Sequence, residues 1–391
     1  KLLNKFKRNA IDAFVLDANS NPYYVFVGGQ SQYPTSATPL EVDSIETDYK
    51  TWNELMFGKK ASFSKMARRY TWTSGTVYTQ YDDTVELKDE QFYVVTSTRD
   101  VFKCIYNNNG AASTVEPTKR AMKIGVPVRE VDGYEWLYLY TISISDFTKF
   151  VTNNYMPVTA NTLIAQSAID GAIFSISIEN NGDEYPGHYG TLLFNPATSS
   201  IILDAGASTS NNYYKDCSIS VTNAVGDTYV RKILTSNTSL QITTEAFPNN
   251  FLSNTGCTYV IGPTVTFDSL SGSGAVGYSV VESGQITKIQ MIDYGSGYRD
   301  ATITITAGSG FGFGAEARAI LSPIGGHGSD IFDELCVDSI GVQCTFDEYG
   351  VSNSFISDVT YRTVGLLKNP RHANIVLYNS NTFNQISTIN I

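Results

Sequence analysis

An internal repeat in the middle of the chain constrains its fold more than any other feature. Two segments share one pattern of glycine, aliphatic and tyrosine residues, and their two glycines are 11 positions apart in both (182 − 171 and 295 − 284). Short aliphatic runs closed by glycine are typical of β-strands that end in tight turns. The matching residues are Gly171, Ile173, Ile176, Ile178, Gly182 and Tyr185 in the first segment and Gly284, Ile286, Ile289, Met291, Gly295 and Tyr298 in the second.

A third Gly-x-x-Tyr, at Gly256 and Tyr259, extends this pattern. When Gly256 and Tyr259 are aligned with Gly295 and Tyr298, the glycine-containing run at 272–275 corresponds to the run at 308–310. Each unit is expected to supply a strand, a glycine turn, a tyrosine that packs back across the turn, and a further strand such as 302–306. Stacked units of this kind predict a β-rich module over residues 171–321.

The sequence on either side of the module indicates one helix and several short strands. Apolar residues at helical spacing, among them Phe6, Ala10, Ala13 and Phe14, predict a helix over 4–16. We expect a mainly β chain, with a β-sandwich-like core, a few short helices, α+β structure at the N-terminus and the module as an insertion. The other predicted elements are a strand at 23–27, mixed helix and loop at 52–66, and strands at 70–73, 92–97, 101–106 and 134–142.

The last of these strands, 134–142, has aromatic residues on one face and leucines on the other. Two apolar faces indicate a core or subunit-interface strand, and a carbohydrate platform is the alternative. The residues in question are Tyr134, Trp136, Tyr138 and Tyr140 on one face and Leu137 and Leu139 on the other.

Charge, hydropathy and cysteine usage exclude several classes of protein. A formal net charge of −11 repels phosphate backbones, so nucleic acid is not expected as a partner. No apolar run approaches the ~18 residues that a bilayer crossing needs, so membrane insertion is not expected. The five cysteines are scattered without a Cys-x-x-Cys pair, which favours free thiols in a reducing cytoplasm over disulfides or a zinc site.

Residues suited to catalysis are few, and we assign no catalytic, cofactor-binding or metal-binding residues. The three histidines are His188, His327 and His372, and none lies in a recognised metal or nucleophile motif. We expect His327 to lie in a loop. Replacement of His327, or of the pair Asp333 and Glu334, by alanine is expected to leave tail assembly largely intact unless folding fails. Two carboxylates could serve a glycosidase, but the sequence does not pair them.

Outside the module, a series of motifs follows one order and spacing. They are 23–29, 52–58, 68–72, 101–104, 113–117, 132–140 and 361–370, the last reading Tyr-Arg-Thr-Val-Gly-Leu-Leu-Lys-Asn-Pro. This series resembles the baseplate wedge subunit that gene eight encodes in T-even-type phages. The resemblance covers residues 1–160 and 330–391, and the glycine-repeat module is a departure from it.

The resemblance implies a structural, non-enzymatic protein of the virion tail baseplate, assembled in the host cytoplasm. It implies a homodimer that joins other wedge proteins, with a discontinuous core domain of residues 1–170 and 322–391. A virion protein that binds or cleaves carbohydrate is the alternative function. The interface candidates are Tyr134, Trp136, Tyr138, Tyr140, Tyr361 and Arg362, and the structural repeat residues are Gly182, Tyr185, Gly256, Tyr259, Gly295 and Tyr298.

Overall fold

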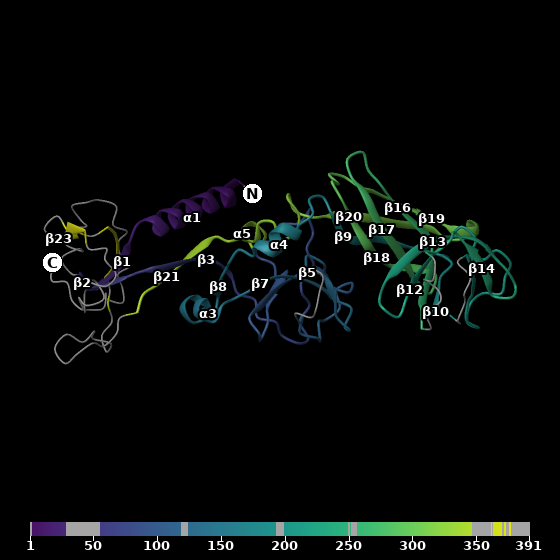
Figure 1. Cartoon of the computed structure of the whole chain (residues 1–391), viewed down its shortest axis with the longest axis horizontal. Coiled ribbons are helices and arrows are strands. Elements are labelled where there is room, and N and C mark those ends of the chain that lie inside the picture. Colours follow the sequence, from purple (N-terminus) through teal and green to yellow (C-terminus); the bar gives the residue numbers. More distant parts are fainter. Residues whose placement is uncertain are drawn as a thin grey trace, which may run out of the picture. The chain divides into compact units, whose positions relative to one another are not determined.

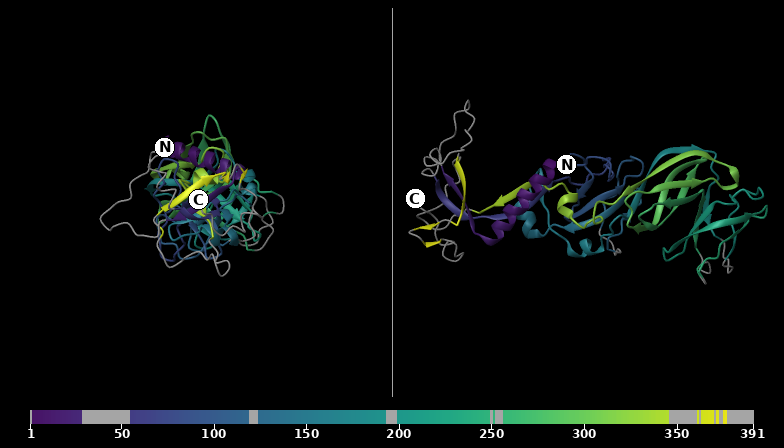
Figure 2. Two further views of the ribbon diagram at one scale, coloured as in Figure 1. Left: turned by 90° about the vertical axis from the view of Figure 1, so that its left-hand side faces the viewer. Right: turned by 90° about the horizontal axis from the view of Figure 1, so that it is seen from above.

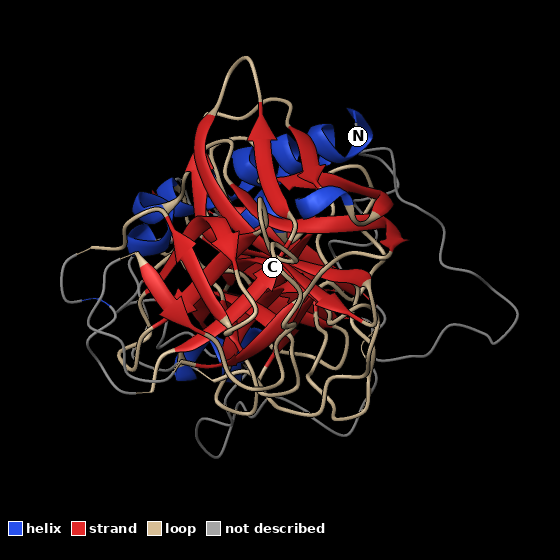
Figure 3. Ribbon diagram, turned by 90° about the vertical axis from the view of Figure 1, so that its right-hand side faces the viewer, coloured by secondary structure: helices blue, strands red, loops and turns tan. Residues whose placement is uncertain are grey.

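The chain is mainly β, as expected from the sequence, and antiparallel sheets dominate it (Figure 3). It divides into two compact units. We name them the terminal unit (Lys1–Thr71, Thr141–Ala160 and Leu335–Ile391) and the central unit (Trp72–Tyr140 and Asn161–Glu334). The computed structural model describes residues 2–28, 55–118, 124–192, 199–248, 251, 256–345, 361, 363–369, 371–372 and 375–376.

One long helix and small antiparallel sheets form the terminal unit. The helix α1 (Leu2–Ser20) packs against β3 (Ser62–Arg68), where the rings of Phe14 and Phe63 lie 5.1 Å apart between centroids (Figure 2). The other elements are β1 (Tyr23–Gly28), β2 (Leu55–Lys60), α3 (Ile144–Phe150), β8 (Tyr155–Pro157), β21 (Ser339–Gln343), β22 (Thr363–Lys368), β23 (Arg371–His372) and β24 (Ile375–Val376).

Two local predictions around this unit are wrong. Residues 55–60 and 62–68 are strands, because β2 pairs with β1, and β3 pairs with β21 on one side and β8 on the other. These ladders outweigh local preference. Residues 70–73 form no strand. Trp72 N instead donates to Val95 O at 3.0 Å, so this stretch only touches the edge of a sheet. The predicted helix at 4–16 and strand at 23–27 are confirmed.

The central unit begins with a four-stranded sheet in the order β4-β5-β7-β6, whose two middle strands, β5 and β7, are labelled in Figure 1. Its strands confirm the predictions at 92–97, 101–106 and 134–142. The turn between β6 and β7 is closed by Gly133 at φ +87°. The elements of this part are β4 (Tyr93–Val95), β5 (Asp100–Tyr106), β6 (Val128–Arg129), β7 (Glu135–Thr141), α4 (Thr162–Ser167) and α5 (Ile331–Glu334).

The repeat appears in the structure as two three-stranded units that exchange strands. The third strand of each unit pairs with the first strand of the other, since β20 pairs with β9 and β17 with β18. The middle strands pair with each other, and Thr266 lies opposite its equivalent Thr304. Repeat A consists of β9 (Ile173–Asp183), β16 (Thr264–Asp268) and β17 (Ser273–Glu282), and repeat B of β18 (Gln285–Ser296), β19 (Thr302–Thr306) and β20 (Phe313–Leu321).

Reciprocal hydrogen bonds tie the two repeats together. Tyr185 N donates to Gly284 O at 2.9 Å, and Tyr298 N donates to Gly171 O at 3.0 Å. The first glycine of each repeat thus accepts from the tyrosine of the other. The predicted equivalence of the two segments is confirmed as a pseudo-two-fold arrangement.

The third Gly-x-x-Tyr is not a third repeat, so this part of the prediction is wrong. Gly256 (φ +88°) has open space where a Cβ would lie, and Tyr259 belongs to another strand with its hydroxyl on Asp204. The run 308–310 forms a 3-10 turn, η2 (Gly308–Gly310), and is not the partner of 272–275. The true equivalents are Gly-Ser-Gly-Ala at 272–275 and Gly-Phe-Gly-Ala at 312–315, a match that the sequence does contain.

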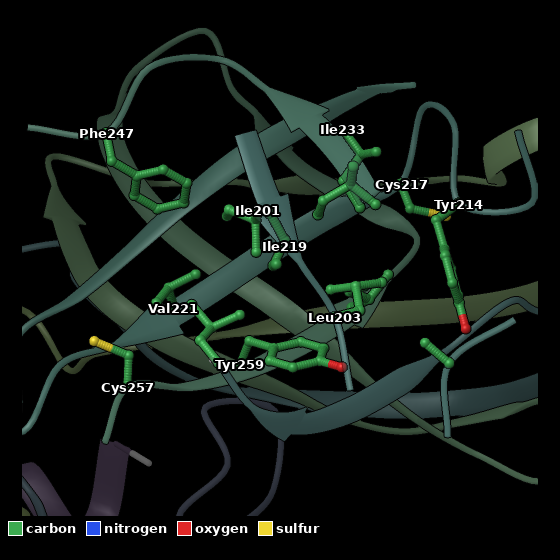
Figure 4. Packing of buried hydrophobic residues seen from close by; sticks show 14 of the residues in the cluster. Ile201, Leu203, Tyr214, Cys217, Ile219, Val221, Ile233, Phe247, Cys257 and Tyr259 are labelled. Atoms are coloured by element: carbon green, nitrogen blue, oxygen red, sulfur yellow. The ribbon is translucent and has the colours of Figure 1, made fainter. Parts of the chain in front are cut away.

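A six-stranded sheet is inserted in repeat A, between Tyr185 and β16. Its strand order is β10-β15-β12-β13-β14-β11. A separate apolar core fills it, with Ile201, Ile219, Ile233 and Tyr259 each at most 1% exposed (Figure 4). The strands of this inserted sheet are β10 (His188–Thr191), β11 (Ser200–Ile202), β12 (Ser218–Thr222), β13 (Thr228–Ser236), β14 (Gln241–Thr244) and β15 (Thr258–Gly262).

The compact units differ from the predicted domains. Residues 72–140 group with the middle of the chain and not with the termini. The physical reason is a set of polar ties to the module: Arg318 pairs with Asp82, and Lys288 pairs with Glu135 at 2.7 Å.

The two ends of the module lie side by side, as an insertion requires. Ile173 is opposite Leu321 in the β9–β20 ladder, and Ser322 N donates to Ala172 O at 2.9 Å. Two hydrophobic clusters, one in the paired repeats and one in the inserted sheet, draw their residues from within 171–321.

Residues 168–324 expressed alone should therefore give a β protein that melts cooperatively. Both clusters stay intact in this fragment. The contacts that are cut include the ion pairs to residues 72–140 and the ring contact between Phe174 and His327. Circular dichroism and a thermal scan test the expectation. An unfolded fragment would show that the module depends on the rest of the central unit.

Candidate functional site

The four aromatic interface candidates in β7 and in the residue before it lie in the core of the chain. Tyr134 and Trp136 are fully buried and stacked at 5.4 Å between centroids, while Tyr138 and Tyr140 are 8% and 2% exposed. Side chains that are already buried cannot supply a subunit interface, so the core alternative is the correct one for this strand. Both faces of β7 are covered, as its alternating pattern predicted.

The two remaining interface candidates lie near the C-terminus. Tyr361 is half-buried and packs against Val25 and Val27 of β1. Arg362 lies outside the described residues.

A buried lysine cluster joins β5 to α5 and to the loop before it. Lys103 is 0% exposed, and its Nζ lies 2.6 Å from Glu334 Oε2 and 2.9 Å from His327 Nδ1, to which it donates. The same Nζ lies 3.7 Å from the centroid of the Tyr81 ring. Gly328 N donates to the other oxygen of Glu334. One carboxylate, one imidazole and one ring thus surround a single ammonium group.

Burial and the lysine charge set the protonation of this cluster. Burial, followed by the neighbouring Lys103, lowers the pKa of His327 to about 4, so the imidazole is neutral near pH 7. Burial alone would raise the pKa of Glu334, but Lys103 and the hydrogen bonds outweigh it and hold the pKa below its usual value. A charged pair with a neutral acceptor is the arrangement that a buried cation needs.

His327 lies in the loop before α5, as expected, and Glu334 is the last residue of α5. Neither side chain is a simple loop or cap residue, however, because both belong to this buried cluster. Their side chains are 2% and 4% exposed, so no substrate in solvent reaches them. The cluster is suited to holding β5 against α5. Sequence reasoning missed it because Lys103 and Glu334 are 231 positions apart.

A second polar cluster lies in the inserted sheet. His188 Nε2 is 2.9 Å from Asp204 Oδ1, and the hydroxyl of Tyr259 donates to Asp204 Oδ2 at 3.1 Å. Burial opposes ionisation of Asp204, but these hydrogen bonds and that from Gly206 N lower its pKa. The cluster ties the segment after β11 to β10 and β15.

An apolar stripe runs along the outer face of α1. Ile11 is buried and Phe14 packs on Phe63 of β3, whereas Phe6 and Leu16 are 72% and 71% exposed. Ala10 and Ala13 are also exposed, and positions 6, 10, 13 and 16 share one side of a helix. We call these four residues the α1 stripe. The sequence pattern had placed Phe14 on the same face, but only the other three belong to this surface.

Several properties of the described residues bear on metals, thiols and membranes. They contain no cluster of three or more His, Cys, Asp or Glu side chains that could hold a metal ion. The five cysteines, all within the described residues, form no disulfide with one another, and burial raises the pKa of the Cys217 thiol to about 12. No helix in the described part is long and apolar enough to cross a membrane.

Comparisons with protein-family models, with curated proteins and with solved structures found no match for this chain. The resemblance to the phage wedge subunit stays a prediction from the sequence motifs.

Proposed function

We propose that this chain is a structural subunit of a phage tail baseplate wedge, which acts through contacts with other wedge proteins and with a second copy of itself. It carries no catalytic role in this proposal, and it assembles into the virion in the host cytoplasm. The ordered motifs on either side of the module support the wedge assignment. The observation that carries the assembly role is the α1 stripe.

The α1 stripe has the properties of a contact surface. Two large side chains, Phe6 and Leu16, are more than two-thirds exposed on one face of a helix whose other face is already packed. Between them lie Ala10 and Ala13, which let another helix approach closely. Large apolar side chains exposed together on one helix face are typical of protein interaction sites.

The end charges of α1 favour a second copy as the occupant. The last turn of α1 contains no basic residue, so its own side chains do not offset the negative end of the helix macrodipole. In an antiparallel pair of α1 helices, the positive end of each lies beside the negative end of the other. Such a contact is isologous and closes as a two-fold dimer.

Replacing both Phe6 and Leu16 by serine should convert the dimer into a monomer of 42.8 kDa. The two changes remove most of the apolar area of the α1 stripe and leave its packed face untouched. Multi-angle light scattering at micromolar concentration measures the mass.

The matched control is Leu163→Ser, since Leu163 is 62% exposed on a different helix, α4. It should leave the dimer intact. A wild-type chain that is strictly monomeric, or a dimer that survives the double replacement, would contradict the role of the α1 stripe.

The wedge assignment has its own test. Genes for tail tube, sheath and baseplate proteins should lie beside the coding sequence, and gold-labelled antibodies should mark the end of the tail that is distal to the head. Labelling of the capsid, or no labelling of intact virions, would overturn the assignment.

A further inference from the structure

An open groove lies where the inserted sheet meets repeat B. Its volume is about 540 Å³, which is within the range of small-ligand sites. One wall comes from residues 210–215, before β12, and the other from η2 and the residue after it. We call it the aromatic groove, and the lining residues that matter here are Asn211, Asn212, Tyr213, Lys215, Ser309 and Phe311.

Backbone hydrogen bonds fix the shape of the aromatic groove. Asn212 N donates to Ser236 O at 2.7 Å, and Lys215 N donates to Asn212 O at 3.1 Å. The Ser309 hydroxyl donates to Lys215 O at 3.0 Å and so joins the two walls. A Cβ added to Gly308 would lie 2.3 Å from Cys217 Sγ, which shows how closely the walls approach at the base. The site is therefore largely formed before any ligand arrives.

Two rings border the aromatic groove. Tyr213 and Phe311 lie 5.9 Å apart between centroids at an interplanar angle of 37°. Phe311 is 50% exposed, and Tyr213 is held by an edge-on contact with Tyr214 at 4.9 Å. An exposed ring beside a fixed ring offers a flat apolar surface to a ligand.

The remaining lining supplies hydrogen bonds around this surface. The amides of Asn211 and Asn212 and the ammonium of Lys215 belong to exposed residues. Amides both donate and accept, which suits hydroxyl groups, whereas a single lysine in a chain of net charge −11 is a poor site for a polyphosphate. Pyranose sugars present an apolar C–H face and a rim of hydroxyls, and this combination matches the groove.

We propose that the aromatic groove binds a glycan through one or two pyranose rings, stacked on Phe311 and Tyr213 and hydrogen-bonded by Asn211, Asn212 and Lys215. The described lining contains no carboxylate, so it lacks the acid pair that glycoside hydrolysis requires. The site binds the sugar without cleaving it. This inference is independent of the assembly role, because the α1 stripe belongs to the terminal unit.

The test applies the full-length protein to an array of bacterial lipopolysaccharide and capsule fragments, followed by saturation-transfer NMR with each bound fragment. Phe311→Ala should weaken binding by about tenfold or more, as expected for the loss of one ring contact. Phe311→Leu should weaken it too, and this variant keeps most of the side-chain volume in case the alanine variant unfolds.

Phe313→Ala is the matched control, because Phe313 is 61% exposed, lies two residues away and does not line the aromatic groove. It should bind as the wild type does. Failure of every fragment to bind at millimolar concentration, an equal loss in the Phe311 and Phe313 variants, or release of new reducing ends would each overturn the proposal.

Discussion

Replacing Lys103 by methionine should lower the free energy of unfolding by about 3–5 kcal/mol, the usual cost of removing one partner from a buried ion pair. The change leaves the carboxylate of Glu334, which is 4% exposed, without its cation. Chemical denaturation followed by tryptophan fluorescence, to which the buried Trp136 contributes, measures the loss.

Lys232→Met is the matched control. Lys232 also pairs with a carboxylate, that of Asp216 at 2.8 Å, but both side chains are more than 40% exposed. Its replacement should leave the unfolding midpoint nearly unchanged. Equal effects of the two replacements would show that burial does not matter to the Lys103 pair.

The double variant Lys103→Met with Glu334→Leu distinguishes two free energies. One is the cost of leaving a buried charge unpaired, and the other is the net contribution of the ion pair to stability. The double variant should recover much of the stability that the single variant loses, because an apolar pair leaves no unpaired charge. A double variant that is as unstable as the sum of the two singles would show that the two side chains are not coupled.

The same cluster should make the protein sensitive to acid. The pKa of His327 is lowered from 6.5 to about 4, so between these values the unfolded chain binds a proton that the folded chain does not. Stability therefore falls as the pH is lowered through this window. Glu334 adds to the loss at lower pH, since its folded pKa is also below the ordinary value. The His327→Gln variant should show a smaller fall than the wild type in unfolding scans between pH 7 and 4.

Gly295→Val is expected to be the second severe change, at about 3 kcal/mol or more, since it combines backbone strain with a steric clash. Gly295 has φ +59°, and a Cβ there would lie 2.6 Å from both Ser273 O and Ala275 N. Those two atoms belong to β17, so relief of the clash requires β17 and β18 to move apart. Denaturation of the full-length protein measures the effect.

The pseudo-two-fold arrangement supplies an internal replicate for this experiment. Gly182 has φ +62°, and a Cβ there would lie 2.6 Å from Phe313 O and Ala315 N. Gly182→Val should therefore destabilise about as much as Gly295→Val. Gly310→Val is the control, because Gly310 also has a positive φ (+78°) but has open space around a Cβ. If all three variants lost the same stability, backbone strain alone would explain the effect.

Local sequence patterns predicted a strand well where the strand itself has a clear β composition or alternation. The β-branched and aromatic runs at 23–27 and 101–106 became β1 and β5, and the threonine and isoleucine alternation at 302–306 became β19 without any shift in its bounds. Residues 55–66 were mispredicted because their neighbours in the sheet, and not their own side chains, make them strands.

The sites were harder to predict because distant segments build them. The sequence does contain one indication of a buried site that the prediction did not use, a lysine in the middle of an apolar run at 101–106. A lysine in a strand buried on both faces must have a buried partner, so the existence of an anion was predictable. Its identity was not, since Glu334 lies on a short helix much further along the chain. The aromatic groove gave no local signal, because residues 210–215 and 309–311 meet only in the folded protein.

The connection between the tyrosine of the glycine turn and the middle strand differs greatly in length between the two repeats. In repeat A, the whole inserted sheet lies between the tyrosine of the glycine turn and β16, whereas in repeat B only residues 299–301 separate Tyr298 from β19. Strand exchange holds both ends of each connection in place, so the length of the connection has little effect on the stability of the paired repeats. The 299–301 link is thus a ready grafting point, at which a foreign domain with adjacent termini could be displayed in pseudo-symmetry with the natural one.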